Sequence, residues 1–482
     1  MQWFVSILLC SVVFFLCFCC GTVGKNGQYT KRREDSNVFT LLWWTPFALS
    51  QGEKRICGDG TCIFTEDRSL LRNPNVKING FLFYGSDFDP SDLPYPRKSD
   101  QWWALLHEES PKNQPLFCHA PILTLFNITS TFRQHSNEPL TLQYLSSIDK
   151  LTDSSKYINT ELKNLLQNNG IAPVIYLQSD CDTPSQRDHF VQELAKHIKV
   201  DSYGSCLQNQ QLPQHLLDAT ATMQHQDLLA LIARYKFALA LENAGCPDYI
   251  TEKLWRPLSL GVVPVYWGAE NIKHWLPNNM SVVHVLDYNS PQQLAQYLRQ
   301  LNSNDDQYER FLEHKLTKVV RNEVLKKSIS DRVWGIDNDP SKVNFIENFE
   351  CSVCNAMHMH QANPGRHIAD IEHYGCPSPN TILGTLRANK PQHKDFKQGD
   401  HVDFNIQERG DSNQGENVVP SWGDPYNHWE EEWHRAKLES KKLGELLNSG
   451  RYSPETYHDD VLQYLIGKGH FRKYPPSVHQ EL

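Results

Sequence analysis

The sequence lacks any long run of basic residues, and its formal net charge is −9. Because nucleic acids bind proteins through concentrated positive charge, no nucleic-acid partner is expected. The chain also lacks internal repeats of the solenoid type. Hydrophobic residues make up 39% and charged residues 21% of the 482 residues, which are ordinary values for a soluble globular body. This length is sufficient for two domains with full cores and for additional tails.

Long hydrophobic runs are also scarce, since only residues 3–20 form an uncharged, almost wholly apolar segment. Its length lies between that of a signal-peptide core and that of a short spanning helix. Thr22 and Gly24 are small enough for a cleavage site, and the basic residues 31–33 follow the segment, which disfavours a simple type II anchor by the positive-inside rule. Residues 1–24 are therefore a signal anchor or a cleaved signal peptide, followed by a short stem at 25–37. Both alternatives place the rest of the chain in the secretory lumen.

Three further features agree with a lumenal location in the Golgi apparatus, the endoplasmic reticulum or both. Asn127 and Asn279 begin the glycosylation sequons Asn-Ile-Thr and Asn-Met-Ser. Nine of the 13 cysteines lie beyond the apolar segment, in keeping with a compartment where disulfides persist. The chain ends in His479-Gln-Glu-Leu482, which resembles the retrieval tetrapeptide of the endoplasmic reticulum except for Gln in place of Asp.

The patterning beyond the stem predicts two α/β domains. In the first domain, residues 38–165, the strand-like runs are 41–44, 81–84, 102–106 and 122–126, and the clearest helix is 151–168. In the second domain, residues 166–350, the predicted strands are 174–178, 200–203, 237–241, 262–267 and 282–286, and the predicted helices are 185–198, 226–234, 249–260 and 291–301. Alternation at this spacing predicts a parallel, doubly wound sheet that binds ligands at the carboxyl ends of its strands.

The character of the chain changes after residue 350. Residues 351–384 form a segment rich in Cys and His, and residues 385–482 form a polar C-terminal extension. We expect residues 385–425 to be disordered and two polar helices to follow, at 429–447 and 455–466.

The most informative stretch contains Phe237-Ala-Leu-Ala-Leu-Glu-Asn243, Asp248-Tyr-Ile-Thr-Glu-Lys-Leu254 and Gly261-Val-Val-Pro-Val-Tyr266. Physically, these runs are a buried strand, the start of a helix and a second buried strand. The free N–H groups of the helix start, with Lys253 in its first turn, suit a diphosphate. The alternative is that Glu252 and Lys253 are solvated surface charges.

These runs resemble the donor-binding signature of the α1,3-fucosyltransferases, whose pattern is close to F-x-L-x-x-E-N, D-Y-I-T-E-K and G-x-V-P-V. The resemblance covers roughly residues 40–355 and includes Val200-Asp-Ser-Tyr-Gly204, Leu125-Phe-Asn-Ile-Thr129 and Glu109-Ser-Pro111. Within that family the chain is most similar to a divergent branch with Leu-Trp-Trp near the start and His-Glu-Glu-Ser-Pro in the first domain. Members of this branch are protein O-fucosyltransferases that modify Ser or Thr of small cysteine-rich EMI domains.

The resemblance implies a GT-B-like fold of two Rossmann-type domains, with an acceptor-binding domain first and a domain for the donor, GDP-fucose, second. It also favours a signal anchor, hence a single-pass type II membrane protein, over a soluble lumenal one. The residues it assigns to the donor are Glu242 and Asn243 at the nucleotide cleft, Tyr249, Glu252 and Lys253 at the nucleotide-sugar, and Arg187 at a phosphate. Arg187 lies in a looser match, and its alternative is a surface helix charge.

Glu109 is the expected catalytic residue, because transfer with inversion needs a carboxylate that takes the acceptor proton as GDP leaves. It follows the predicted strand 102–106 at the end that should face the cleft. Glu108 points elsewhere if the strand continues. Without the resemblance, a Glu before Ser-Pro would be read as an ordinary turn residue.

A metal-dependent alternative rests on Asp180-Cys-Asp182, a D-x-D triplet after a strand of the kind that binds Mn²⁺ and a sugar diphosphate. Asp87-Phe-Asp89 shows how easily this triplet arises. We expect no metal and no other cofactor, because Arg187 and Lys253 already supply the positive charge that a metal would bring.

The cysteines allow two interpretations. Cys351 and Cys354, with His373 and Cys376, have the spacing of a zinc knuckle, although disulfides are favoured in an oxidising lumen. The resemblance implies disulfides between the Cys351/Cys354 pair and the region of Cys57 and Cys62. Cys181 with Cys206 is a further plausible pair, and an odd number of lumenal cysteines leaves at least one free or intermolecular.

The sequence therefore predicts an inverting, GDP-fucose-dependent fucosyltransferase acting on a glycoprotein or a folded protein domain. Ser/Thr O-fucosylation of EMI domains is the main interpretation. Two alternatives stay open, namely α1,3-fucosylation of N-acetylglucosamine in a glycan and a non-catalytic, lectin-like or chaperone protein of the lumen.

Overall fold

The computed structural model describes residues 38–48, 50–218, 221–336, 341–362, 364–365, 367–388 and 427–470. The apolar segment 1–24, the stem 25–37, residues 389–425 of the stretch expected to be disordered, and the tail at 479–482 lie outside the described residues. Within the described part of the chain, no helix combines the length and the apolar character needed to cross a membrane.

The first half of the described chain forms a six-stranded sheet in the order β2-β3-β1-β4-β5-β6. Its strands are β1 (Phe39–Trp43), β2 (Gln51–Cys57), β3 (Gly60–Thr65), β4 (Ile78–Tyr84), β5 (Trp102–His107) and β6 (Ile128–Thr131). All neighbours are parallel except β2 and β3, which form an antiparallel hairpin at one edge. Every residue of β5 is buried, as expected of a strand covered on both faces. The carboxyl end of β5 therefore leads from the core to the loop that carries Glu109.

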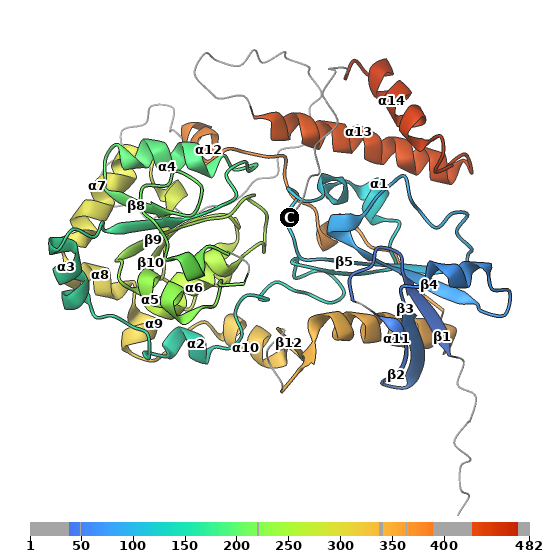
Figure 1. Ribbon diagram of the computed structural model, residues 1–482, viewed down its shortest axis with the longest axis horizontal. Coiled ribbons are helices and arrows are strands. Elements are labelled where there is room, and N and C mark those ends of the chain that lie inside the picture. The colour runs from blue at the N-terminus through green and yellow to red at the C-terminus, as the bar shows by residue number, and fades with distance from the viewer. Residues whose placement is uncertain are drawn as a thin grey trace, which may run out of the picture. The chain divides into compact units, whose positions relative to one another are not determined.

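A second, five-stranded sheet has the order β11-β10-β9-β7-β8 and is entirely parallel. Its strands are β7 (Val174–Leu177), β8 (Val200–Tyr203), β9 (Phe237–Leu241), β10 (Val263–Trp267) and β11 (Val283–His284). The helices that connect or follow these strands are α4 (Arg187–Ala195), α5 (Gln226–Ala233), α6 (Glu252–Leu260) and α7 (Pro291–Asn302), and they surround the sheet in Figure 1. The order of strands reverses beside β7, where open α/β sheets bind ligands.

The other helices are α1 (Ala120–Leu123), α2 (Asp149–Thr152), α3 (Thr160–Asn168), α8 (Asp305–Arg310), α9 (Glu313–Leu316), α10 (Glu323–Asp331), α11 (Phe345–Ala362), α12 (Ile382–Ala388), α13 (His428–Asn448) and α14 (Tyr457–Gly467). Strands β12 (Trp334–Gly335) and β13 (Val343–Asn344) form a small separate pair. An α/β fold with parallel sheets is thus confirmed.

Three local predictions were wrong or incomplete, and two elements were not predicted. Residues 385–388, expected to be disordered, form the end of helix α12. Residues 122–126 are not a strand, because Pro121 stands in the first turn of the short helix α1 and β6 begins only at Ile128. The predicted helix 151–168 is two helices, α2 and α3, separated by a loop. The hairpin β2–β3 and helix α11 were not predicted. Helix α11 nevertheless buries an apolar residue at every fourth position, namely Phe345, Phe349, Val353 and Met357.

The two C-terminal helices belong to the core of the first sheet. In Figure 1, α13 runs beside α1, and the two helices are in contact. Leu443 and Leu446 of α13 and Tyr457 of α14 are buried in the same apolar cluster as Phe117 and Ile122. The extension is therefore part of the folded body along residues 427–470.

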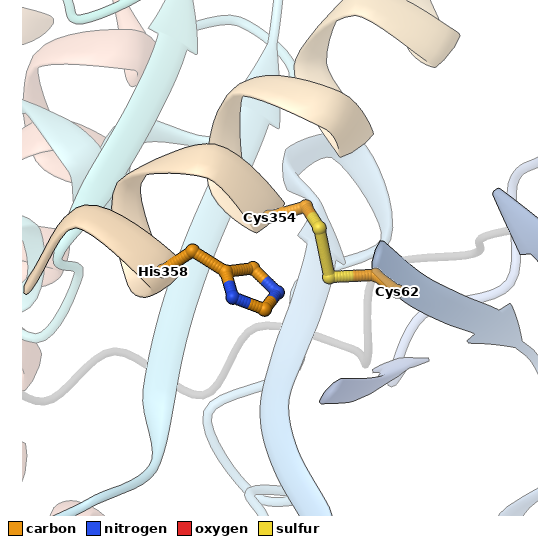
Figure 2. A group of neighbouring side chains, drawn as sticks. All are labelled: Cys62, Cys354 and His358. Atoms are coloured by element: carbon orange, nitrogen blue, oxygen red, sulfur yellow. A yellow bond between two sulfur atoms is a disulfide. The ribbon is translucent and has the colours of Figure 1, made fainter. Parts of the chain in front are cut away.

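Four disulfides join distant segments of the described chain. They are Cys57–Cys351, Cys62–Cys354, Cys181–Cys206 and Cys246–Cys376, and Cys118 is a buried free thiol. Figure 2 shows His358 of α11 beside the Cys62–Cys354 bond, a group whose ligand atoms are close enough for a metal. Because both sulfurs are consumed by the disulfide, the structure offers zinc no thiolate here. Cys351 and Cys376 are likewise disulfide-bonded.

Candidate active site

The loop after β5 presents Glu109 toward residues that follow β9. The Tyr374 hydroxyl donates a hydrogen bond to the backbone carbonyl of Glu109 at 2.9 Å. The Tyr249 hydroxyl donates to Oε2 of Glu109 at 3.4 Å. These two phenols fix both the backbone and the carboxylate of Glu109, so the side chain reaches the loop that precedes α6.

The surroundings of Glu109 make its carboxylate a stronger base than usual. Burial raises its pKa, the nearby Lys253 ammonium lowers it, and the Glu252 carboxylate raises it again, with a net increase. A carboxylate with a raised pKa accepts a proton more readily. Glu109 therefore combines position and basicity for proton abstraction.

Glu242, at the end of β9, organises the start of α6. Its carboxylate is fully buried and accepts hydrogen bonds from the backbone N–H of Thr251 at 2.8 Å and from the Thr251 hydroxyl at 2.9 Å. Thr251 is in turn the N-cap of α6 and accepts a hydrogen bond from the N–H of Lys253. Glu242 therefore holds the helix terminus in place through its carboxylate.

Lys253 extends from the first turn of α6 into a group of carboxylates. Its Nζ lies 3.2 Å from Glu252, 3.6 Å from Glu242 and 3.1 Å from the Thr251 hydroxyl. Although burial opposes the charge, the two carboxylates raise the pKa of Lys253, so it stays an ammonium. Burial likewise opposes the charge of Glu252, but Lys253 and Arg256 hold its pKa at about 2. The helix start thus carries fixed, ionised groups of both signs.

Arg187 is the first residue of α4 and is only 1% exposed, so it is not a surface charge. Its guanidinium donates to the backbone carbonyls of Leu241 at 3.1 Å and of Asp180 at 2.7 Å. It is also close enough to Lys253 to disfavour that residue's charge. Oδ1 of Asn243 is buried without a hydrogen-bond partner in the described part of the chain. Two cations and an unsatisfied amide oxygen thus gather at the ends of β7 and β9.

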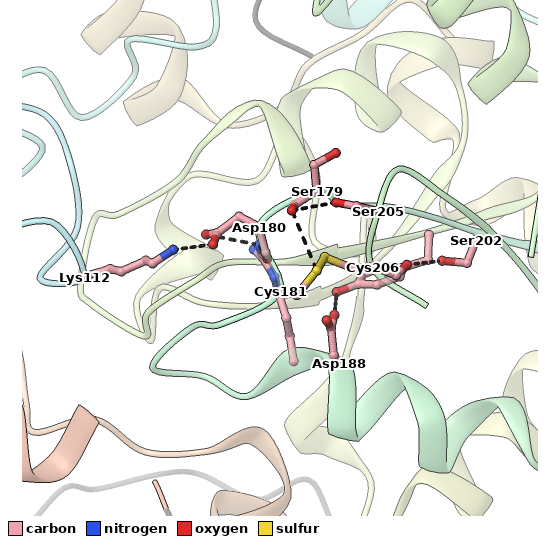
Figure 3. Close-up of a disulfide and its surroundings, with 10 residues drawn as sticks. Lys112, Ser179, Asp180, Cys181, Asp188, Ser202, Ser205 and Cys206 are labelled. Atoms are coloured by element: carbon pink, nitrogen blue, oxygen red, sulfur yellow. Dashed lines mark hydrogen bonds and ion pairs between the residues drawn. A yellow bond between two sulfur atoms is a disulfide. The ribbon is translucent and has the colours of Figure 1, made fainter. Parts of the chain in front are cut away.

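The D-x-D triplet does not converge on one point. Asp180 forms ion pairs with Lys112 and Arg187, whereas Asp182 accepts a hydrogen bond from the Trp429 indole at 3.0 Å. Between them, Cys181 is disulfide-bonded to Cys206, as Figure 3 shows. Because the two carboxylates face different partners, they do not form a joint metal site in this geometry.

Sequence reasoning missed several residues of this site. Tyr144 is partly buried, and its pKa is raised by desolvation and by the nearby Glu109 and Glu252 carboxylates. It lies in a loop, so no local pattern identifies it. Arg256 stands four residues after Glu252 on α6, a spacing that does indicate a pair on one helix face. The Cys246–Cys376 disulfide, which joins the loop after β9 to the segment of Tyr374, also gave no sequence signal.

The two sequons differ in their surroundings. The side-chain amide of Asn127 is fully engaged, because its oxygen accepts from the backbone N–H of Trp103 at 2.9 Å and from Arg97, and its nitrogen donates to the carbonyl of His367 at 2.9 Å. Asn279 is exposed in a turn. Only Asn279 therefore offers an accessible amide in the folded protein.

Comparison with known proteins gives a consistent family. The model "Glycosyltransferase family 10 (fucosyltransferase) C-term" matches residues 168–374, and "Fucosyltransferase, N-terminal" matches residues 35–144. Proteins named GDP-fucose protein O-fucosyltransferase 3 are similar to this chain. The one from Danio rerio is 47% identical, over 74% of this chain and 80% of its own length. The one from Homo sapiens is 45% identical, over 71% of this chain and 72% of its own length.

A solved structure titled α1,3-fucosyltransferase with GDP-fucose has a TM-score of 0.37 with this fold and 15% sequence identity, covering 69% of this chain and 92% of that chain. A likeness of this degree provides no residue-level correspondence.

Proposed function

Because the chain belongs to glycosyltransferase family 10, the fucosyltransferases, we propose that it transfers fucose from GDP-fucose to a hydroxyl group of a protein, with inversion. The observation that carries this proposal is the Glu109 carboxylate, held by Tyr249 within the electrostatic reach of Lys253. A base for the acceptor and a cation for the diphosphate are thus supplied side by side.

In this reaction Glu109 takes the proton of the acceptor hydroxyl. At the same time the oxygen of that hydroxyl attacks the anomeric carbon of fucose. The bond from that carbon to the β-phosphate oxygen breaks on the opposite face, and GDP departs with the electron pair. Lys253 and Arg187 compensate the negative charge that develops on the diphosphate. Asn243, with its unsatisfied amide oxygen, is positioned to bind a hydroxyl of the donor.

The two sheets fit the GT-B arrangement that the sequence resemblance implies. In this arrangement the first sheet, within residues 38–165, belongs to the acceptor domain and the second, within residues 166–350, belongs to the donor domain. The grouping of Arg187, Asn243 and Lys253 at the carboxyl ends of β7 and β9 supports donor binding by the second sheet.

The acceptor follows from the names of the relatives and from the sequence resemblance together. The relatives named above are protein O-fucosyltransferases. The divergent branch that the sequence resembles modifies Ser or Thr of EMI domains, so a folded, cysteine-rich domain is the proposed acceptor. No metal or other cofactor is proposed to take part, because Lys253, near Glu109, and Arg187, near Lys253, supply positive charge.

The compartment proposed for this reaction is the lumen of the Golgi apparatus, the endoplasmic reticulum or both, with residues 1–24 as the proposed membrane anchor. The four disulfides of the described chain support an oxidising compartment.

The test is to incubate the lumenal body with GDP-fucose and one of two acceptors, a folded EMI domain or a glycan that ends in N-acetylglucosamine. Mass spectrometry should detect one deoxyhexose on a Ser or Thr of the EMI domain, together with release of GDP. Transfer to the glycan alone would overturn the proposed acceptor. If neither acceptor is modified and no GDP is released, the catalytic proposal itself is wrong.

A further inference from the structure

Lys112 lies on the same loop as Glu109 and faces the second sheet. A tight turn at Ser110 sets its position, since the backbone N–H of Lys112 donates to the Ser110 hydroxyl at 3.3 Å and that of Asn113 to the Ser110 carbonyl at 3.0 Å. The intervening Pro111 lines a small cavity together with Ser185, which precedes α4. The loop that carries the base therefore abuts the segment that leads to Arg187.

The Lys112 ammonium meets the second sheet at Asp180. Figure 3 shows Lys112 reaching Oδ1 of this carboxylate. Arg187 lies 3.7 Å from the other oxygen, Oδ2. Two cations from opposite sheets thus converge on one carboxylate, which is an arrangement that also suits a phosphate group.

The exposures of these three groups show which of them is free to move. The Arg187 side chain is 1% exposed and that of Lys112 is 21% exposed, whereas that of Asp180 is 45% exposed. A competing anion can therefore displace the Asp180 carboxylate toward solvent and leave both cations in place. Arg187 does not depend on that carboxylate, because its main contact with Asp180 is the backbone carbonyl at 2.7 Å.

The second sheet on its own presents little unbalanced positive charge. Lys253 is flanked by Glu242 and Glu252, and the charge of Arg187 is partly matched by Asp180. A sugar diphosphate carries about two negative charges, and more negative charge develops on its β-phosphate as the glycosidic bond breaks. A further cation adds to the positive charge that Arg187 and Lys253 supply. The first half of the chain contributes two cations to these loops through ion pairs. Arg133 is paired with the buried Asp248, whereas Lys112 is paired with the more exposed Asp180 and can exchange this partner for a phosphate.

We propose that Lys112 binds the β-phosphate of the sugar-nucleotide donor, so that one loop supplies both the base for the acceptor and a cation for the leaving group. This inference rests on the proposed function and extends it to a residue outside the donor signature. It also links proton transfer from the acceptor to stabilisation of the leaving group, because Glu109 and Lys112 are only three positions apart.

The test compares the binding of GDP and of GMP by isothermal titration calorimetry, using the full lumenal chain. Lys112→Ala should weaken GDP binding about tenfold or more, since one charge-assisted contact is lost. GMP lacks the β-phosphate, so its affinity should change less than twofold. Asp180→Asn removes the competing charge and keeps the backbone carbonyl for Arg187, so GDP should bind as tightly as to the wild type or more tightly.

Lys77→Ala is the matched control. Lys77 forms a similar surface ion pair with Asp100, at 2.6 Å, but lies where β4 begins, at the amino end of a parallel strand. The loop of Glu109 and Lys112 instead leaves the carboxyl end of the neighbouring strand β5. Its substitution should leave the affinities for both nucleotides unchanged.

A purely structural ion pair makes the opposite prediction. Lys112→Ala and Asp180→Asn would then lower the melting temperature together and leave GDP affinity unaltered, which would overturn the proposal. If Lys112→Ala weakens the binding of GMP as much as the binding of GDP, contact between Lys112 and the β-phosphate is also refuted. Failure of the wild-type protein to bind GDP would instead refute the proposed function, so the two failures are distinguishable.

Discussion

The hydroxyl of Tyr249 lies 3.4 Å from Oε2 of Glu109 and joins the loop before α6 to the loop after β5. Tyr249 itself is buried, with its ring against Phe132. Because Tyr249 stands just before the helix whose first turn carries Lys253, the position of the proposed base is tied to that of the proposed donor site. Disturbing either loop should therefore affect the chemical step.

Substituting Glu109 by Gln should separate catalysis from binding. Gln keeps the size of the side chain and can still accept a hydrogen bond from Tyr249, but it cannot take up the acceptor proton. We expect kcat to fall by about 10² to 10⁴ while the affinity for GDP stays near that of the wild type. Lys253→Ala should show the reverse pattern and mainly weaken GDP binding.

Both variants need an unchanged melting temperature and normal secretion to be interpreted. If a well-folded Glu109→Gln variant keeps more than about half of the wild-type kcat, the base is another carboxylate. The adjacent Glu108 would then be tested first, because its Oε2 is buried without a partner in the described structure.

The second sheet was predictable because its strands are short apolar runs bounded by turn residues and separated by amphipathic helices. Strands β7, β8 and β9 lie within a residue or two of the predicted ranges. The edge strand β2 was not predictable, because most of its side chains are exposed and it has no apolar alternation. Its position is fixed by pairing with β3 and by the Cys57–Cys351 disulfide, which no local pattern encodes.

The residues of the candidate site also divide into those that the sequence predicts and those that it does not. Glu109 and Lys253 belong to contiguous motifs, and the structure brings them together. Tyr374 and Lys112 reach the site through contacts with residues 265 and 68 positions away along the chain, respectively. Contacts of this kind depend on the completed fold, so a single sequence does not reveal them.

Glu108 should make the stability of the protein depend on pH. It accepts a hydrogen bond from the Tyr84 hydroxyl at 3.1 Å, and burial raises the pKa of its carboxyl from the ordinary 4.5 to about 7. The folded protein then binds this proton more tightly than the unfolded chain. The resulting stabilisation is fully present below pH 4.5 and is lost as the pH rises through about 7.

Glu108→Gln, which has no proton to lose, should therefore gain stability relative to the wild type on going from pH 5 to pH 8. The gain corresponds to at most about 3 kcal/mol, at about 1.4 kcal/mol per pKa unit. Melting temperatures of both proteins across this range provide the measurement. The Glu431→Gln substitution, at an exposed position on α13, is the control. Its melting temperature should differ from that of the wild type by the same amount at every pH. If the melting temperature of Glu108→Gln also differs from that of the wild type by the same amount at every pH, the raised pKa of Glu108 is contradicted.

Fucose transfer should not require a divalent metal. Asp180 and Asp182 have separate partners. The cation Lys253 lies near the proposed base Glu109, and Arg187 lies near Lys253. Turnover in excess EDTA should equal turnover with added Mn²⁺. A loss of more than about tenfold that Mn²⁺ restores would show that a metal binds the diphosphate, and the roles given to both cations would need revision.

Glycosylation should distinguish the two sequons. Asn279 is exposed, whereas the amide of Asn127 donates to His367 and accepts from Trp103. A glycan on Asn127 would remove these bonds from the core next to β5. Peptide mapping of the secreted protein after enzymatic deglycosylation should show conversion of Asn279 to Asp and an unmodified Asn127. Modification of Asn127 in correctly folded protein would contradict the geometry of this buried amide.

The C-terminal extension should be necessary for the stability of the first sheet. Leu443 of α13 is fully buried in the cluster that contains Phe117 and Ile122, and the Cβ that a residue at Gly444 would carry would lie only 3.2 Å from Pro121. Leu443→Ala should destabilise the protein by about 2–5 kcal/mol, through lost apolar contact and the cavity left behind. Leu462→Ala on α14 removes the same atoms from a side chain that is 45% exposed and should cost much less.

Thermal unfolding and the yield of secreted protein measure both effects. If the two variants were equally stable, α13 would contribute little to the core. The large effect expected of Leu443→Ala depends on α13 completing the apolar cluster that also contains Tyr374, whose hydroxyl donates to the carbonyl of Glu109.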